Sequence, residues 1–267
     1  MADSSRMPHA TLGPEPSSEL DDFFRLWART DSGTASYWHT GFMYALTEGR
    51  KLVPLVRYSG LFRVFVEPRE GAYRTTVSDA VMFSDATGSS DAPLATLRNP
   101  VTGRTVRCQH FFEGPFTLES TASAERVLIN GGPEVVIPFR PRRWHRFGSQ
   151  VVVSRDIYGL ANPGATPTPA AGATVQPLTL ATFSGSLAEL RQSRSTSVAN
   201  AILSQQFVGP WMPWLDMSQH AGAAVSCGAG QKLKSDLSDL PRRSRGQLAR
   251  LHPAILRSVE HWKDSNR

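Results

Sequence analysis

Two acid–base residues lie in the segment GPWMPWLDMSQHAG, directly after its two tryptophans. Asp216 and His220 lie there at a spacing of four residues, which allows a carboxylate and an imidazole to share a hydrogen bond. His39, in SYWHTGFMYAL, and His110, in RTVRCQHFF, lie in two other aromatic segments. Because the ordinary pKa of histidine lies near neutrality, these side chains are suited to moving protons. We therefore predict His39, His110, Asp216 and His220 as catalytic residues.

The aromatic segment itself is predicted to be a loop over apolar surface. Pro210 and Pro213 prevent a regular strand ladder there. The tryptophans and methionines carry apolar area that is worth about 25 cal/mol per Å² when it leaves water, so the loop must cover something. It either closes one end of a filled interior or lines a ligand pocket, since aromatic and methionine side chains are typical of small-molecule sites. In the second case Trp211, Trp214 and Met217 form the pocket wall.

Three further side chains are candidates for orienting a substrate oxygen, namely Tyr37, Arg57 and Tyr58. The guanidinium of Arg57 offers a rigid set of donors, and the glycine two residues after Tyr58 permits an unusual turn. Strand alternation places Tyr37 and His39 on one face of their segment and Trp38 on the other. Both faces then carry bulky residues, which is typical of a β-wall between a filled or ligand-lined interior and an outer helix.

Short β-like segments make up most of the chain. They are rich in valine, phenylalanine, tyrosine and threonine, and turn residues separate them. The segments are residues 36–46, 51–58, 61–67, 73–84, 104–112, 125–130, 134–139, 150–158 and 175–183. A doubly wound α/β fold needs helices between its strands, and the sequence lacks them. The pattern predicts a mainly β protein, either an antiparallel calycin-like barrel or a strongly curved sheet.

Helical patterns flank this β-rich region. Helical spacing predicts an N-terminal amphipathic helix from four apolar residues, Leu20, Phe23, Phe24 and Trp27. Two short helices, broken at Pro241 or Pro253, are expected in the C-terminal segment 236–262, packed on the outside of the β-structure. Residues 1–17 are predicted to be a flexible tail and residues 18–267 a single domain.

Signatures of cofactor or metal binding are missing from the sequence. It has no glycine-rich phosphate loop, no dinucleotide-binding glycine pattern, no HExxH and no GxSxG. His110 and Glu113 resemble a chelating pair, but strand alternation sends them to opposite faces. Cys108 and Cys227 lie far apart and are expected to be reduced thiols. We therefore predict no cofactor and no metal.

Composition and charge narrow the choice of partner. Hydrophobic residues make up 40% of the chain, enough for a substantial core, and the formal net charge is +6. No nucleic-acid-binding motif accompanies the charge, so the arginine-rich segment 138–147 is interpreted as an exposed hairpin edge. The N-terminus resembles no signal peptide and no stretch approaches eighteen apolar residues, which predicts a cytoplasmic protein without a membrane span. The oligomeric state is left open.

Several motifs together are similar to those of one protein family. YWHTGFMYAL, LVRYSGLFR, the NPVTGRTV turn followed by HFFEGP, and PWMPWLDMSQHAG resemble the DUF1838 family, over about Asp21 to Trp262. Arg104, Glu113 and Ser218 stand where the family pattern has Glu, Asn and Gly. The resemblance implies a calycin-type barrel and, since the family is named for unknown function, no particular reaction.

Three functions are consistent with the sequence. The first is a cofactor-independent enzyme that cyclises, isomerises or dehydrates an apolar polyketide- or terpenoid-like intermediate by holding it in a reactive shape. The second is a noncatalytic binding or carrier protein for a hydrophobic small molecule. The third is an interaction module that uses the arginine-rich edge, for which binding to an anionic polymer would weaken steeply with salt. The first is the leading hypothesis, and a hydrophobic small molecule is its expected partner.

Overall fold

The computed structural model describes residues 16–47, 49, 52–128, 135–137, 142–158, 178–192 and 198–257. The strands are β1 (Gly33–Thr47), β2 (Val53–Arg69), β3 (Ala72–Asp85), β4 (Thr96–Arg98), β5 (Thr105–Arg107), β6 (Phe111–Thr121), β7 (Glu125–Leu128), β8 (Val135–Ile137), β9 (Arg143–Phe147), β10 (Gln150–Tyr158), β11 (Leu178–Ser186), β12 (Ile202–Gly209) and β13 (Gly222–Lys232). The helices are α1 (Pro16–Trp27), α2 (Leu187–Gln192) and α3 (Arg242–Leu251), with single 3₁₀ turns η1 (Pro213–Leu215), η2 (Asp236–Asp239) and η3 (Pro253–Leu256).

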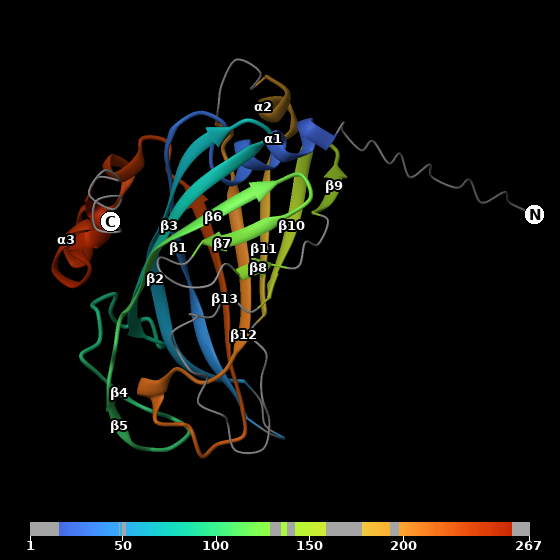
Figure 1. Cartoon of the computed structure of the whole chain (residues 1–267). Coiled ribbons are helices and arrows are strands. Elements are labelled where there is room, and N and C mark those ends of the chain that lie inside the picture. The colour runs from blue at the N-terminus through green and yellow to red at the C-terminus, as the bar shows by residue number, and fades with distance from the viewer. Residues whose placement is uncertain are drawn as a thin grey trace, which may run out of the picture.

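Eleven of the strands form one sheet in the order β8-β7-β6-β3-β2-β1-β13-β12-β11-β10-β9. Every strand pair in it is antiparallel. The sheet curves strongly, so that β6 and β10 face one another across its interior (Figure 1). No pairing among the described residues joins the edge strands β8 and β9. The mainly β antiparallel fold is therefore confirmed in its curved-sheet form, and closure into a barrel is not shown.

The strands at the centre of the sheet are longer than the sequence predicts. Segments 51–58 and 61–67 are one strand, β2, of 17 residues. The unusual turn that Gly60 permits does not form, because Gly60 pairs within the ladder with His39 and Val81. The predicted strand 104–112 divides instead into β5 and the start of β6. The hydrogen-bonded register across neighbouring strands, which outweighs a local glycine signal, sets these boundaries.

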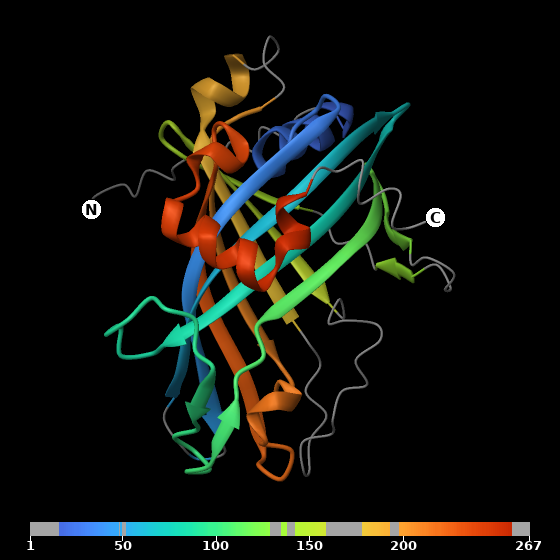
Figure 2. The ribbon, with the colours of Figure 1, turned by 90° about the vertical axis from the view of Figure 1, so that its left-hand side faces the viewer.

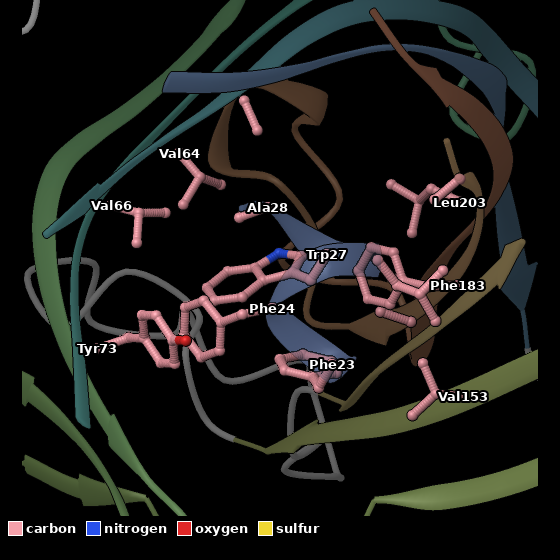
Figure 3. Close-up of a cluster of buried hydrophobic side chains, with 14 of the residues drawn as sticks. Phe23, Phe24, Trp27, Ala28, Val64, Val66, Tyr73, Val153, Phe183 and Leu203 are labelled. Atoms are coloured by element: carbon pink, nitrogen blue, oxygen red, sulfur yellow. The ribbon is translucent and has the colours of Figure 1, made fainter. Parts of the chain in front are cut away.

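Helix α1 lies inside the curve of the sheet. The sequence predicted instead that this helix would flank the β-structure. Phe23, Phe24 and Leu26 are fully buried, and Figure 3 shows Phe24 beside Tyr73, with Trp27 in the middle of the buried side chains. The Phe24 and Tyr73 rings stack with centroids 3.9 Å apart. Aromatic residues on several sides of the helix bury more area inside a curved sheet than on its outside. We call the apolar region around α1 the upper cluster.

Lys232 fixes the end of α1 against the sheet. Its Nζ donates hydrogen bonds to the backbone oxygens of Arg25 (2.8 Å), Ala28 (3.1 Å) and Ala199 (2.9 Å). A cation at the C-terminus of a helix satisfies carbonyls that have no partner within the helix and complements the helix dipole. Lys232 therefore holds α1 in the interior.

The C-terminal helices cover the convex side of the sheet, as predicted. Pro241 precedes α3 and Pro253 begins η3, so the chain breaks at both predicted prolines. Figure 2 shows α3 and the C-terminal 3₁₀ turns η2 and η3 lying over the outer side of the central strands. The C-terminal segment and strands β2 and β3 together bury an apolar cluster, which consists of Leu61, Ala80, Met82, Leu240, Leu248 and Ile255.

A buried arginine on β2 ties this C-terminal segment down. Arg63 Nη1 donates to the backbone oxygens of Ile255 (2.8 Å) and Arg257 (2.9 Å), and its Nη2 donates to Asp236 (3.1 Å). Since the Arg63 side chain is only 4% exposed, water cannot easily replace these bonds.

Replacing Arg63 by Met is expected to lower the free energy of unfolding by about 2 kcal/mol, because Asp236 and two carbonyls lose their donor. Hydrogen exchange should report lost protection in residues 236–257 with little change in β1–β3, and urea titration should give the stability. Arg243→Met, at an exposed position of α3, is the matched control. Equal exchange in the two variants would contradict this role for Arg63.

The arginine-rich segment 138–147 was predicted to be an exposed edge of the sheet. Its strand β9 is an edge strand of the sheet and is largely exposed, and residues 138–141 lie outside the described residues. Cys108 is buried and Cys227 exposed, and both are free.

None of the described helices has the length and hydropathy that crossing a membrane requires.

Candidate functional site

A band of polar side chains crosses the concave face of the sheet. Above it lies the upper cluster around α1. Below it lies a second apolar cluster, the lower cluster, which includes Phe83, Trp211, Leu215 and Met217. We call the residues between and beside these clusters the concave band, and it consists of His39, Tyr58, Asp79, Glu113, Gln205 and Ser226.

His39 and Asp79 form a hydrogen-bonded pair across a glycine. His39 Nε2 lies 3.0 Å from Asp79 Oδ1, with the His39 side chain 2% exposed and that of Asp79 24% exposed. Gly60 lies on the strand between them, and a Cβ there would come within 2.6 Å of His39 Nε2. Only glycine leaves room for the imidazole to cross β2 and reach β3.

The pairing indicates which nitrogen of His39 carries the proton. An ionised carboxylate only accepts, so Nε2–H donates to Asp79. Nδ1 of His39 is buried and has no hydrogen-bond partner among the described residues. His39 therefore orients the Asp79 carboxyl group, which stays partly accessible.

Glu113 stands directly opposite Asp79 in the ladder between β3 and β6. Burial, and then the charge of Asp79, raise the pKa of Glu113 to about 7. Two neighbouring carboxyl groups of this kind do not both ionise easily, because each charge opposes the other. Because the pKa of Glu113 lies near neutrality, Glu113 can both hold and release a proton at neutral pH, directly beside the carboxyl group of Asp79.

Tyr58 lies flat across two glycines of the neighbouring strands. A Cβ on Gly41 would come within 2.5 Å of the Tyr58 hydroxyl oxygen, and one on Gly228 within 2.1 Å. The hydroxyl thereby reaches the side chains of Gln205 and Ser226, and burial raises the pKa of Tyr58. The phenol is consequently a neutral hydrogen-bond donor at physiological pH.

The concave band is accessible from solvent and has apolar neighbours. Asp79, Glu113 and Gln205 are partly exposed, and so are three phenylalanines that share their face, Phe62, Phe116 and Phe207. Partly exposed phenylalanines beside a few polar groups are typical of small-molecule sites. Among the described residues, no group of three or more His, Cys, Asp or Glu is arranged to hold a metal ion.

Of the four predicted catalytic residues, the structure places His39 in the concave band and the other three elsewhere. His110 faces the convex side, where its ring lies 6.4 Å from that of His252. Its Nδ1 accepts a hydrogen bond from the backbone N–H of Phe83 (3.2 Å), and burial, with the neighbouring His252 and Arg250, lowers the pKa of His110. The predicted separation of His110 from Glu113 is confirmed, since Glu113 faces the concave side.

Asp216 and His220 do not bind one another as the sequence spacing predicted. Asp216 is in the left-handed conformation after η1 (φ 54°), and its carboxylate pairs with Arg104 at 2.8 Å on the surface. The backbone oxygen of His220 accepts a hydrogen bond from Trp211 Nε1 (2.8 Å). The helical spacing is not used, because residues 216–221 form turns instead of a helix.

The predicted loop at residues 210–221 is confirmed, and its apolar side chains close the lower cluster. Trp211 and Met217 are buried at 4% and 1% exposure. The partly buried Trp214 packs on Phe83, with ring centroids 5.5 Å apart. These side chains fill the interior below the concave band.

The three predicted oxygen-orienting residues lie in three different environments. Tyr58 belongs to the concave band. Tyr37 is fully buried in the upper cluster, and its hydroxyl donates to the backbone oxygen of Leu26 at 2.7 Å. Arg57 pairs with Asp91 at 3.2 Å and lies over the ring of Phe42, which is an exposed residue.

The sequence did not predict four members of the concave band as site residues. Asp79 lies inside a predicted strand without a motif around it, and the pattern at Glu113 suggested a chelating pair with His110 instead of an acid. Gln205 and Ser226 lie on β12 and β13, which were not predicted as strands. A signal existed in the glycines: Gly41, Gly60 and the pair Gly228–Gly230 fall at alternating strand positions, where they give large side chains room to cross.

The fold and the site together define a strongly curved antiparallel β-sheet protein with a helix inside the curve and a group of histidine, carboxyl and tyrosine side chains on its concave face. The sequence model of the family described as "Protein of unknown function (DUF1838)" matches residues 32–267. The chain therefore belongs to the DUF1838 family, as its motifs predicted. No protein among the curated sequences matches it.

Proposed function

We propose that the protein is a cofactor-independent enzyme of small-molecule biosynthesis that cyclises, isomerises or dehydrates an apolar compound by proton transfer. The observation that carries this proposal is the arrangement of Asp79, which His39 orients at 3.0 Å, next to Glu113. The interior of the curved sheet would hold the substrate in the way that a calycin-like barrel does. A cytoplasmic location stays a prediction.

The two carboxyl groups have complementary roles in the proposed reaction. Asp79 takes a proton from a substrate carbon, and the electron pair of that C–H bond becomes part of a new double bond. Glu113 delivers its proton to a second carbon in an isomerisation or cyclisation, or to a departing hydroxyl that leaves as water. Proton exchange with solvent then restores both groups. An acid–base pair of this kind contributes roughly 10²- to 10⁴-fold in rate.

Deuterium incorporation tests the proposal whatever the product is, because proton transfer to carbon in D₂O leaves a label. The protein would be incubated in D₂O with a panel of apolar ketones, enones and allylic alcohols, and mass spectrometry would follow deuterium uptake and loss of water. Wild type should catalyse exchange in at least one class, and Glu113→Gln and Asp79→Asn should each reduce the rate at least about 100-fold. Exchange that is unaffected by both substitutions, or missing throughout the panel, would refute proton-transfer catalysis at this site.

A noncatalytic carrier of a hydrophobic molecule is the second candidate. The observation that favours it is the partial exposure of Phe62, Phe116 and Phe207 on the concave face, since such apolar area gains free energy on binding any apolar ligand. Native mass spectrometry of protein purified from its host distinguishes the two. A retained ligand that wild type leaves chemically unchanged in D₂O would favour the carrier.

A further inference from the structure

We propose, on the basis of the proposed function, that Tyr58, Gln205 and Ser226 form a subsite that binds an uncharged hydroxyl or carbonyl oxygen at the far end of an elongated apolar substrate. The three side chains come from three strands, β2, β12 and β13, and meet on the concave face.

The first argument is that the Tyr58 hydroxyl has polar neighbours without being satisfied. It is buried and makes no hydrogen bond of ordinary geometry to a described residue, although Gln205 and Ser226 lie beside it. A buried hydroxyl without a partner destabilises the fold, because it has lost its hydrogen bonds to water without replacing them. A ligand oxygen that accepts from Tyr58 would recover this energy, with the Ser226 hydroxyl and the partly exposed Gln205 amide as further donors.

The second argument is that the backbone is adapted to this position of the ring. Gly41 and Gly228 are direct partners in the β1–β13 ladder, and Gly41 also pairs with Tyr58. Any larger residue at either glycine would collide with the hydroxyl end of the ring. Two adjacent glycines in central strands weaken a sheet. Their presence here is explained by the room that the Tyr58 ring needs.

The third argument concerns the charge of the ligand. Burial raises the pKa of Tyr58 most, and the charge of Asp79 also raises it. The same burial and the same charge that disfavour a phenolate disfavour an anionic ligand beside the hydroxyl. An uncharged oxygen, as in an alcohol, ketone or ester, is therefore the fitting partner, and a carboxylate is not.

The fourth argument sets the length of the ligand. His39 Nε2, which holds Asp79, lies over Gly60 of β2, whereas the Tyr58 hydroxyl lies over Gly228 of β13. Strand β1 lies between them, so the two positions are two strand spacings, roughly 10 Å, apart. An oxygen bound at Tyr58 thus anchors an elongated molecule whose reacting carbon lies beyond His39, at Asp79 and Glu113.

Binding of decan-1-ol tests this subsite, with undecane and decanoate as matched probes of similar length. NMR of protein with ¹³C-labelled tyrosine rings would follow the Tyr58 signal, which Tyr58→Phe assigns. Decan-1-ol should shift this signal and bind about 5- to 10-fold more tightly than undecane, as one additional hydrogen bond predicts, and more tightly than decanoate. Tyr58→Phe keeps the ring and should remove the preference for the alcohol, and Ser226→Ala should reduce it.

Equal binding of alcohol and hydrocarbon by wild type, a preference that survives in Tyr58→Phe, or no binding of any probe would each overturn the subsite. Thermal melting of the variants would show that the fold is kept. The preference for alcohol depends on the Tyr58 hydroxyl, whereas deuterium exchange depends on Asp79 and Glu113. If the preference for the alcohol is intact but no exchange is catalysed, only the proposed function is refuted. If exchange is catalysed but the preference is missing, only the subsite is refuted.

Discussion

Replacing Glu113 by Gln is expected to make the protein's stability less dependent on pH between 5 and 8. The pKa of Glu113 is raised from 4.5 to about 7 in the fold. Between these values the folded chain binds more protons at this residue than the unfolded chain does, so wild type loses stability as the pH rises. Integrated over the shift, the contribution is up to about 3 kcal/mol, reduced by the partial exposure of the side chain.

Urea titration at pH 5 and pH 8 checks this expectation. The two proteins should differ least at pH 5, where this side chain is neutral in both folded chains, and Glu113→Gln should gain up to about 2.5 kcal/mol over wild type between pH 5 and pH 8. Glu119→Gln removes a carboxyl from the same strand, away from Asp79, and is the control. A difference between Glu113→Gln and wild type that is the same at both pH values would show that Glu113 is an ordinary ionised carboxylate and leave the site without its proton donor.

Replacing Gly228 by Ala is expected to lower the free energy of unfolding by about 3 kcal/mol, at the upper end of the range for overpacking. The new Cβ would lie 2.1 Å from the Tyr58 hydroxyl and 2.7 Å from the backbone oxygen of Thr40. Tyr58 must then leave its place over the glycines or β13 must move away from β1. Either response also disturbs the concave band.

A double-mutant cycle separates the two contacts. In a Tyr58→Ala background Gly228→Ala should cost at least about 1 kcal/mol less, because only the contact with Thr40 persists. Gly246→Ala, in α3 where no atom lies within 4 Å of the new methyl group, is the control and should stabilise by up to about 1 kcal/mol. If Gly228→Ala costs the same with and without the Tyr58 ring, the glycine is not there to admit Tyr58.

Much of the fold followed from local chemistry. Alternating apolar residues predicted most of the strands and the two faces of β1, and the positions of the prolines predicted the loop at 210–221 and the breaks in the C-terminal segment. These features depend on neighbours within a few residues, since a proline cannot donate to a ladder and a strand exposes alternate side chains to opposite faces. The separation of His110 from Glu113 followed from the same rule.

The missed strands and the misplaced helix depended on distant parts of the chain. β12 and β13 contain small and polar residues, such as Ser226 and Gly228, whose strand conformation comes from pairing with β1 and β11. The aromatic residues of α1 predicted an amphipathic helix. Whether it lies outside or inside the sheet depends on the sheet's curvature, which no local pattern encodes.

The sequence by itself determined the class of the fold and the kinds of side chain that can transfer protons. Which of them meet was decided by strand register: His39 reaches Asp79, 40 residues away, only because Gly60 lies between them in the ladder, and Glu113 joins through β6. Asp216 and His220, four residues apart, are turned to other partners. A spacing of four residues brings side chains together within a helix, whereas in a sheet the side chains that meet come from different strands.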